Sequence, residues 1–153
     1  MLMPRTRVGV PPAWVVAATV LVSLGMATWA GAATTSGDAD QPAIIDTIQS
    51  QLDAFQRDDG IEAFSYASPR IQERFRTPGN FMAMVRTGYP AVYRPSAVEF
   101  LDIELRDGRI FQPVRFVGPD GEAVIAIYEM ERQVDGIWKI NGVYLVRMGE
   151  VAS

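Results

Sequence analysis

Few side chains in this sequence could carry chemistry, and those that could are mainly carboxylates and tyrosines. The chain has no histidine and no cysteine, which removes the commonest general base, thiolate nucleophiles and the usual ligands of transition metals. Glu129 and Glu131 alternate with Met130 and therefore share one face of an expected strand. Paired carboxylates in a cleft can serve acid–base catalysis, whereas a pair at the end of a strand is usually solvated. Both interpretations stand at this point.

A second group of candidates surrounds the segment Gly-Tyr-Pro-Ala-Val-Tyr-Arg-Pro at residues 88–95. Its prolines and glycine predict a stiff, extended crossover from helices to strands. Tyr93 and Arg94 could fasten this crossover to the core, with Arg94 paired to an acidic neighbour, or could line the mouth of a pocket and hydrogen-bond a ligand. Gln112 shares an expected strand face with apolar residues. A polar group there either lines a pocket or lies at a sheet edge that is exposed to solvent. The candidate ligand-binding residues are Tyr93, Arg94, Gln112 and Tyr128.

Charge and motifs exclude several classes of partner. The net charge is −4, and without Arg5 and Arg7 the residues after 33 hold 12 basic and 18 acidic side chains. Such a domain has no basic surface for nucleic acid or for anionic lipid. The sequence contains no glycine-rich phosphate loop, no EF-hand pattern and no dinucleotide fingerprint. We therefore expect no cofactor, no bound metal and no nucleic-acid partner.

The N-terminal segment predicts transport across a membrane. No charged residue lies between Arg7 and Asp38, and an apolar run precedes Ala30-Gly31-Ala32. This pattern is typical of a secretory signal cleaved after Ala32, but residues 13–33 could also span a bilayer as an uncleaved anchor. In both cases the domain lies outside the cytoplasm, periplasmic or secreted after cleavage, and touches the membrane only through this segment. The expected divisions are signal or anchor 1–33, linker 34–40, and one domain 41–150.

Helices are expected in the first half of this domain. Apolar residues recur at helical spacing between Ile44 and Phe55, with Asp40 as a possible cap. A short second helix is expected near 61–66. Two further helix starts are indicated by a capping hydroxyl placed before a proline, at Ser68-Pro69 and Thr77-Pro78.

Strands are expected in the second half, because the apolar period changes to two after Pro95. The runs are 97–106, 109–117, 122–133 and 137–148, separated by turn sequences that contain Asp-Gly. The predicted fold is α+β, with N-terminal helices followed by a curved four-stranded antiparallel sheet. The phase of the first run changes near Phe100, which indicates a bulge or bend. Val124 to Tyr128 is apolar on both faces, so the chain's own curl or a second copy covers the outer face, and a homodimer is one expectation.

The chain resembles a known family through several motifs. These are Ala67-Ser-Pro69, the run from Phe81 to Pro95, Tyr128-Glu-Met-Glu131 and Trp138-Lys-Ile-Asn-Gly142. They are similar to a family of exported bacterial proteins catalogued only as domain of unknown function 4864, over residues 44–146. The resemblance implies no activity. The order of helices and then sheet also looks like the cone of nuclear-transport-factor-2-like and ketosteroid-isomerase-like proteins, although those cones often interleave helices with strands.

Together these observations predict an exported, non-enzymatic domain that binds a small molecule or interacts with another envelope protein. The alternative is a cofactor-free enzyme that uses carboxylate and tyrosine acid–base chemistry in a cone-shaped pocket. A ligand-sized cavity of roughly 300 Å3 or more, with polar groups converging in it, is the feature that discriminates between a site and a filled core.

Overall fold

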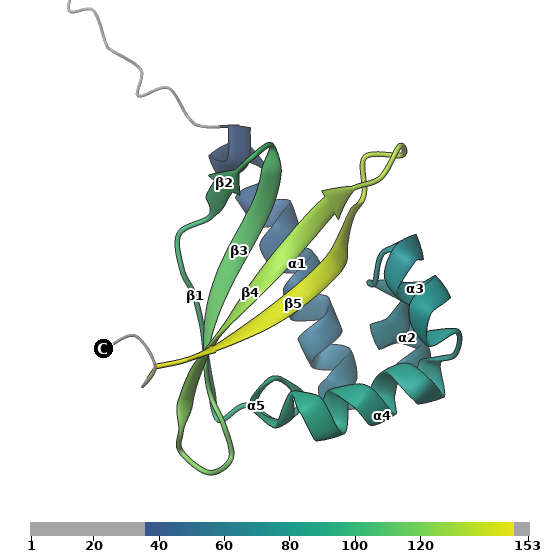
Figure 1. The fold of residues 1–153 in the computed structure, drawn as a ribbon, viewed down its shortest axis with the longest axis vertical. Helices are drawn as coiled ribbons and strands as arrows, with labels where there is room; N and C mark the ends of the chain where they lie inside the picture. The colour runs from purple at the N-terminus through teal and green to yellow at the C-terminus, as the bar shows by residue number, and fades with distance from the viewer. Residues whose placement is uncertain (1–35, 149–153) are drawn as a thin grey trace, which may run out of the picture. The chain divides into compact units, whose positions relative to one another are not determined.

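The computed structural model describes residues 36–148, so the predicted signal or anchor at 1–33 lies outside the described residues. None of the described helices is long and apolar enough to cross a membrane. Helices come first and strands follow (Figure 1), which confirms the predicted α+β order. The elements are α1 (Ser36–Gln56), α2 (Gly60–Ser65), α3 (Pro69–Phe75), α4 (Pro78–Gly88), α5 (Pro90–Tyr93), β1 (Ala97–Phe100), β2 (Glu104–Arg106), β3 (Arg109–Val117), β4 (Ala123–Arg132) and β5 (Trp138–Arg147).

Helix α1 supplies a large part of the helical side of the core. Ile44, Ile48, Leu52 and Phe55 are at most 2% exposed and lie on one side of the helix. The helix begins at Ser36 and so includes most of the segment expected to be a linker.

The next helices begin where the sequence predicts. The Ser68 hydroxyl accepts a hydrogen bond from the Ile71 N–H at 3.4 Å, and the Thr77 hydroxyl accepts one from the Asn80 N–H at 3.2 Å. Each cap is followed by a proline in the first turn of its helix.

The expected extended crossover needs a correction, because residues 90–93 form the short helix α5. Proline restricts φ to a value that suits the first turn of a helix as well as an extended chain. Pro90 therefore ends α4 and also opens α5.

The strands form one antiparallel sheet in the order β1-β3-β4-β5, and β2 also pairs with β3. The sheet has five strands rather than the expected four, because the first run is divided into β1 and β2. The division lies just after Phe100, where the sequence predicted a bulge or bend and the structure has a break between two strands. At this break the Leu101 N–H donates to the Pro113 carbonyl at 3.0 Å. The sheet is open and does not close on itself.

One face of the sheet packs on the helices. Val114, Phe116, Ala126 and Tyr128 on this face are all 0% exposed. Helix α1 crosses behind the sheet in Figure 1. Helices α2 to α4 lie beside the edge strand β5 (Figure 1). A parallel bridge between Ala67 and Ile140 joins the turn before α3 to β5.

The opposite face of the sheet carries a shallow groove of about 340 Å3. Ile125 and Ile127 are half-buried there, so the run that is apolar on both faces has one face in the core and one in this groove. The groove is lined by Leu101, Asp102, Glu104, Pro113, Ile125, Ile127 and Val146. Self-association through this face stays a prediction.

Candidate functional site

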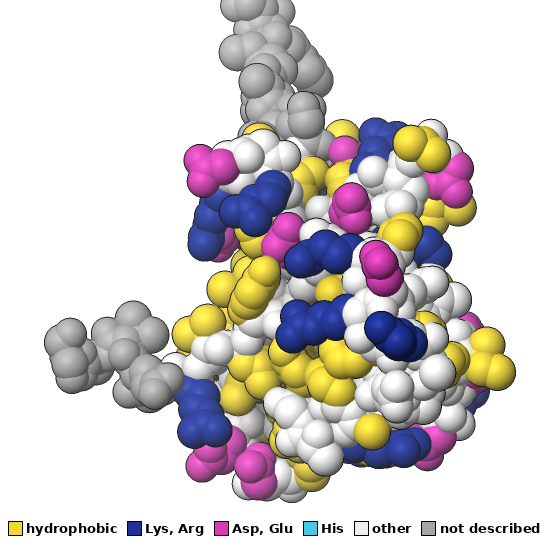
Figure 2. Space-filling model, turned by 45° about the vertical axis from the view of Figure 1, so that its right-hand side comes forward, with side chains coloured by type: hydrophobic (Ala, Val, Ile, Leu, Met, Phe, Trp, Pro, Cys, Tyr) yellow, Lys and Arg dark blue, Asp and Glu magenta, His cyan; other side chains and the backbone are white. Residues whose placement is uncertain are grey.

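A cleft of about 440 Å3 lies between helices α3 and α4 and strand β5. Its walls come from elements far apart in the sequence and are mostly apolar. The apolar lining residues include Phe55 of α1, Phe75 of α3, Phe81, Met84 and Val85 of α4, Val92 of α5, and Ile140 and Val143 of β5. In Figure 2 a hollow lined by hydrophobic side chains faces the viewer, with basic side chains standing beside it.

The cleft exists because α3 is attached to the sheet at one end only. The Ser68 N–H donates to the Ile140 carbonyl at 2.8 Å, and the Ile140 N–H donates to the Tyr66 carbonyl at 2.9 Å. These bonds hold the α2–α3 turn against β5. The far end of α3 instead packs on α4 through Phe75, whose ring centroid lies 5.8 Å from that of Phe81 in an edge-to-face contact.

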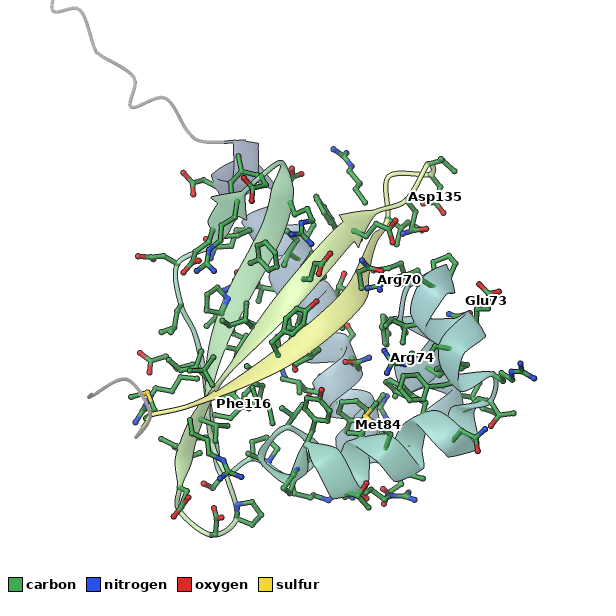
Figure 3. The ribbon with its side chains drawn as sticks, viewed as in Figure 1. Arg70, Glu73, Arg74, Met84, Phe116 and Asp135 are labelled. Atoms are coloured by element: carbon green, nitrogen blue, oxygen red, sulfur yellow. The ribbon has the colours of Figure 1, made fainter. Side chains whose placement is uncertain are left out.

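Two arginines are the only charged residues among those that line the cleft. Arg70 and Arg74 are exposed and lie four residues apart on α3, hence on one face of the helix. Figure 3 shows both pointing toward β5, whereas Glu73 points away and Met84 points into the same space from α4. The rim of the cleft is therefore positive, although the chain as a whole is acidic.

Arg70 is oriented by the extra residue of a β-bulge. Strand β5 shifts register between Glu129 and Met130, which pair with Gly142 and Ile140, so Asn141 is unpaired. Arg70 Nε donates to Asn141 Oδ1 at 3.1 Å, and Arg70 Nη2 donates to the Asn141 carbonyl at 2.6 Å.

Asn141 is in turn held from two sides. Its Oδ1 also accepts from the Ser68 hydroxyl at 2.8 Å, and its Nδ2 donates to Glu129 Oε1 at 3.2 Å. The second oxygen of the buried Glu129 carboxylate accepts from the Tyr144 hydroxyl at 3.0 Å. That hydrogen bond raises the pKa of Tyr144. A chain of polar contacts thus connects Tyr144, at the rim, to Arg70.

Tyr93 and Arg94 lie outside this cleft, in a cluster around Asp58. The Tyr93 hydroxyl donates to Asp58, and Arg94 Nη2 donates to Asp58 Oδ2 at 3.0 Å. The Arg94 guanidinium stacks 4.0 Å from the centroid of the Tyr93 ring. The Tyr93 hydrogen bond lowers the pKa of Asp58. Arg94 therefore has the acidic neighbour that one interpretation of the sequence expected.

Gln112 and Tyr128 face each other across β3 and β4, and both are 0% exposed. Gln112 Nε2 donates to the Leu101 carbonyl at 2.6 Å, and its Oε1 accepts from Gln41 Nε2 at 3.1 Å. Gln112 thus fixes the break between β1 and β2. The Tyr128 hydroxyl has no hydrogen-bond partner in the described part of the chain, and burial raises the pKa of this phenol.

The four residues predicted to bind a ligand therefore lie in two places, and none of them lines the cleft. A ligand role for them stays a prediction. The Glu129–Glu131 pair is also not a pair in a cleft, because Glu129 is buried while Glu131 is exposed beside Lys139. Within residues 36–148 no three acidic side chains gather closely enough to hold a metal ion.

Arg70 and Arg74 were not among the predicted site residues, although the sequence contains a signal for them. The signal is that two arginines four residues apart share one face of a helix, where they repel each other; the solvent-exposed face of an ordinary helix can show the same pattern. The sequence does not show that this face of α3 is turned toward β5.

Comparison with known proteins gave one match. The model of the family described as Domain of unknown function (DUF4864) matches residues 37–152, which confirms the resemblance seen in the motifs. No curated protein and no solved structure matched the chain.

Proposed function

We propose that this chain, which belongs to the family described as Domain of unknown function (DUF4864), is an exported, non-enzymatic protein that binds a small molecule in the cleft between α3, α4 and β5. The observation that supports this proposal is the size and the lining of the cleft. Its volume of about 440 Å3 falls within the range of roughly 300–1,000 Å3 that is usual for ligand sites. Mostly apolar walls with a few polar groups at the rim are the common composition of such sites.

The walls of the cleft are part of the hydrophobic core. Phe81, Val85, Val92 and Ile140 are between 3% and 6% exposed and belong to the core. A ligand that enters does not need to order these side chains, so little of its binding energy is lost to conformational entropy. Binding removes apolar surface of the ligand and of the cleft from water, which contributes a favourable free energy of roughly 25 cal/mol per Å2.

The lining favours binding over acid–base catalysis. Tyr89 and Tyr144 bring hydroxyl groups to the cleft, but no acidic residue lines it. The nearest buried carboxylate, Glu129, is engaged by Asn141 and Tyr144. The Tyr89 hydroxyl donates to the Val143 carbonyl at 3.0 Å. A general acid or base must lie within reach of the substrate, and here no carboxylate of the described residues does, while both tyrosine hydroxyls of the cleft already donate to protein acceptors.

The proposal is tested with N-phenyl-1-naphthylamine, a neutral apolar probe whose fluorescence rises when it leaves water. We expect saturable binding of one probe per chain. Met84→Trp should abolish this binding, because Met84 is half-buried and points into the cleft, where the larger ring takes the place of a ligand.

Met148→Trp is the matched control, since Met148 is 55% exposed and does not line the cleft. Its binding should equal that of the unmodified chain, and both variants should keep the thermal unfolding of the parent. Probe fluorescence that comes from binding to the N-terminal apolar segment is the same in both variants, so it cancels when the two are compared. Equal binding by the two variants would refute the cleft as the site.

A further inference from the structure

We propose that the ligand of this cleft is an amphipathic anion, with an apolar body against the cleft walls and one anionic headgroup between Arg70 and Arg74. This inference rests on the proposed function and specifies its ligand. The headgroup is a carboxylate, sulfonate or phosphate, which share the planar or tetrahedral oxygens that guanidinium groups bind.

The distribution of charge is the first argument. Acidic residues outnumber basic ones after residue 33, by 18 to 12, yet the charged residues that line the cleft are Arg70 and Arg74 alone. Two guanidinium groups one turn apart on α3 repel each other. An anion between them removes this repulsion, whereas a neutral ligand leaves it in place.

The unused hydrogen-bonding capacity of the two arginines is the second argument. The Arg74 side chain makes no ion pair or hydrogen bond with any described residue, and its guanidinium carbon lies 5.8 Å from the centroid of the Phe75 ring. Arg70 uses Nε and Nη2 on Asn141, so its Nη1 has no protein partner in the described range. Arg57, Arg86 and Arg94 differ, since each has a carboxylate partner; Arg76, directly after α3, has no such partner among the described residues but does not line the cleft.

Arg70 is also held in position before any ligand arrives. Asn141, which accepts both of its hydrogen bonds, is itself held by the Ser68 hydroxyl at the same Oδ1 and by Glu129 at Nδ2. An arginine that is already oriented loses less side-chain entropy when it binds an anion. Both guanidinium groups are exposed at the rim, so a headgroup there keeps part of its hydration and avoids the cost of full burial.

The same charges favour a single dissolved molecule over a membrane surface. Anionic lipid attracts domains with extended basic surfaces, and this domain is acidic outside the cleft. The occupant to which we commit is therefore one amphiphile that enters the cleft.

The test adds a second probe, 8-anilinonaphthalene-1-sulfonate, which has the same aromatic body as N-phenyl-1-naphthylamine and carries a sulfonate. We expect the full chain to bind the sulfonate probe about tenfold more tightly than the neutral probe. Arg74→Gln should remove most of this preference without changing the affinity for the neutral probe. Arg74→Lys should keep much of it, and added salt should weaken it.

Arg106→Gln is the control for net charge, since Arg106 is exposed on β2, does not line the cleft and forms its ion pair with the half-buried Glu104. It should leave both affinities unchanged. Equal affinities for the two probes, or an unchanged preference in Arg74→Gln, would overturn the anionic headgroup while the cleft remains the site. Failure of both probes to bind, or binding that Met84→Trp does not affect, would instead overturn the proposed function.

Discussion

Replacing Tyr128 with phenylalanine should stabilise this domain. The Tyr128 hydroxyl is fully buried and has no hydrogen-bond partner among the described residues. Burial of a hydroxyl without a partner costs about 1–3 kcal/mol in proteins. Phenylalanine keeps the ring and its tilted contact with Phe116, at 6.4 Å between centroids. We therefore expect the free energy of unfolding to rise by about 1 kcal/mol at neutral pH, and the Tm by about 4 °C.

The advantage of the Tyr128→Phe variant should grow at high pH. Burial raises the pKa of the Tyr128 phenol, whereas the same phenol in the unfolded chain titrates near its ordinary value of about 10. Above that value the unfolded chain loses the proton and the folded chain keeps it, so the unfolded state is favoured. The parent should lose about 1.4 kcal/mol of stability per pH unit from this group, until the pH reaches the folded pKa. The other tyrosines are present in both proteins and cancel in the difference.

Urea unfolding followed by circular dichroism, at neutral pH and above about pH 10, measures both effects. Tyr89→Phe is the matched control, because the Tyr89 hydroxyl does have a partner in the Val143 carbonyl. Its loss should destabilise the domain by about 1 kcal/mol. Destabilisation by Tyr128→Phe of similar size would show that its hydroxyl is satisfied, for example by a buried water, and would refute the reasoning. A stable variant that no longer binds ligand would instead support Tyr128 as the ligand-binding residue predicted from the sequence.

Three further predictions concern the rest of the chain. Tyr93→Ala should lower the free energy of unfolding by about 2 kcal/mol, since it removes the Arg94 stack and the Asp58 hydrogen bond; normal stability with lost ligand binding would assign Tyr93 to a ligand. If the outer face of the sheet forms a homodimer, light scattering at tens of micromolar should show twice the chain mass and Ile127→Glu should restore the monomer, while a monomeric parent would end this expectation. A reporter that is active only outside the cytoplasm, fused after Ser153, should be active, and activity of a cytoplasm-only reporter would contradict the predicted export.

The features that sequence analysis predicted correctly are those set by neighbouring residues. Ser68 and Thr77 cap helices because their hydroxyls reach N–H groups three residues on, which depends on nothing beyond the local chain. The turns at Gly108, Gly121 and Gly136 have positive φ of 75°, 83° and 85°, which glycine adopts without steric cost.

The features that were missed depend on contacts between distant segments. Division of the first strand into β1 and β2 requires that Gln112 bond the Leu101 carbonyl from the neighbouring strand. A change of phase at Phe100 therefore predicted a bend but not two strands. The conformation after Pro90 was ambiguous for a different reason, since its fixed φ is compatible with both a helix and an extended chain.

The cleft is the clearest example of a feature that depends on contacts between segments far apart in the sequence. Arg70 and Arg74 have the alternation expected of the outer face of a helix whose inner face carries Ile71 and Phe75. They become the rim of a site only because β5 lies opposite them, and the bond from Arg70 to Asn141 spans 71 positions of the sequence. Helical periodicity reports which residues share a face but not what lies opposite that face.

The attachment of the α2–α3 turn to β5 also determines when the domain can form during synthesis. Strand β5, the last of the strands within residues 36–148, provides the Ile140 groups that bond Tyr66 and Ser68, and it provides one wall of the cleft. The helices emerge first but lack this partner, and short helices without tertiary packing are marginal in water. A nascent chain that ends before Trp138 therefore holds its apolar helix faces exposed, and chaperones can keep it unfolded. The α2–α3 turn therefore reaches its final position only when β5 is available.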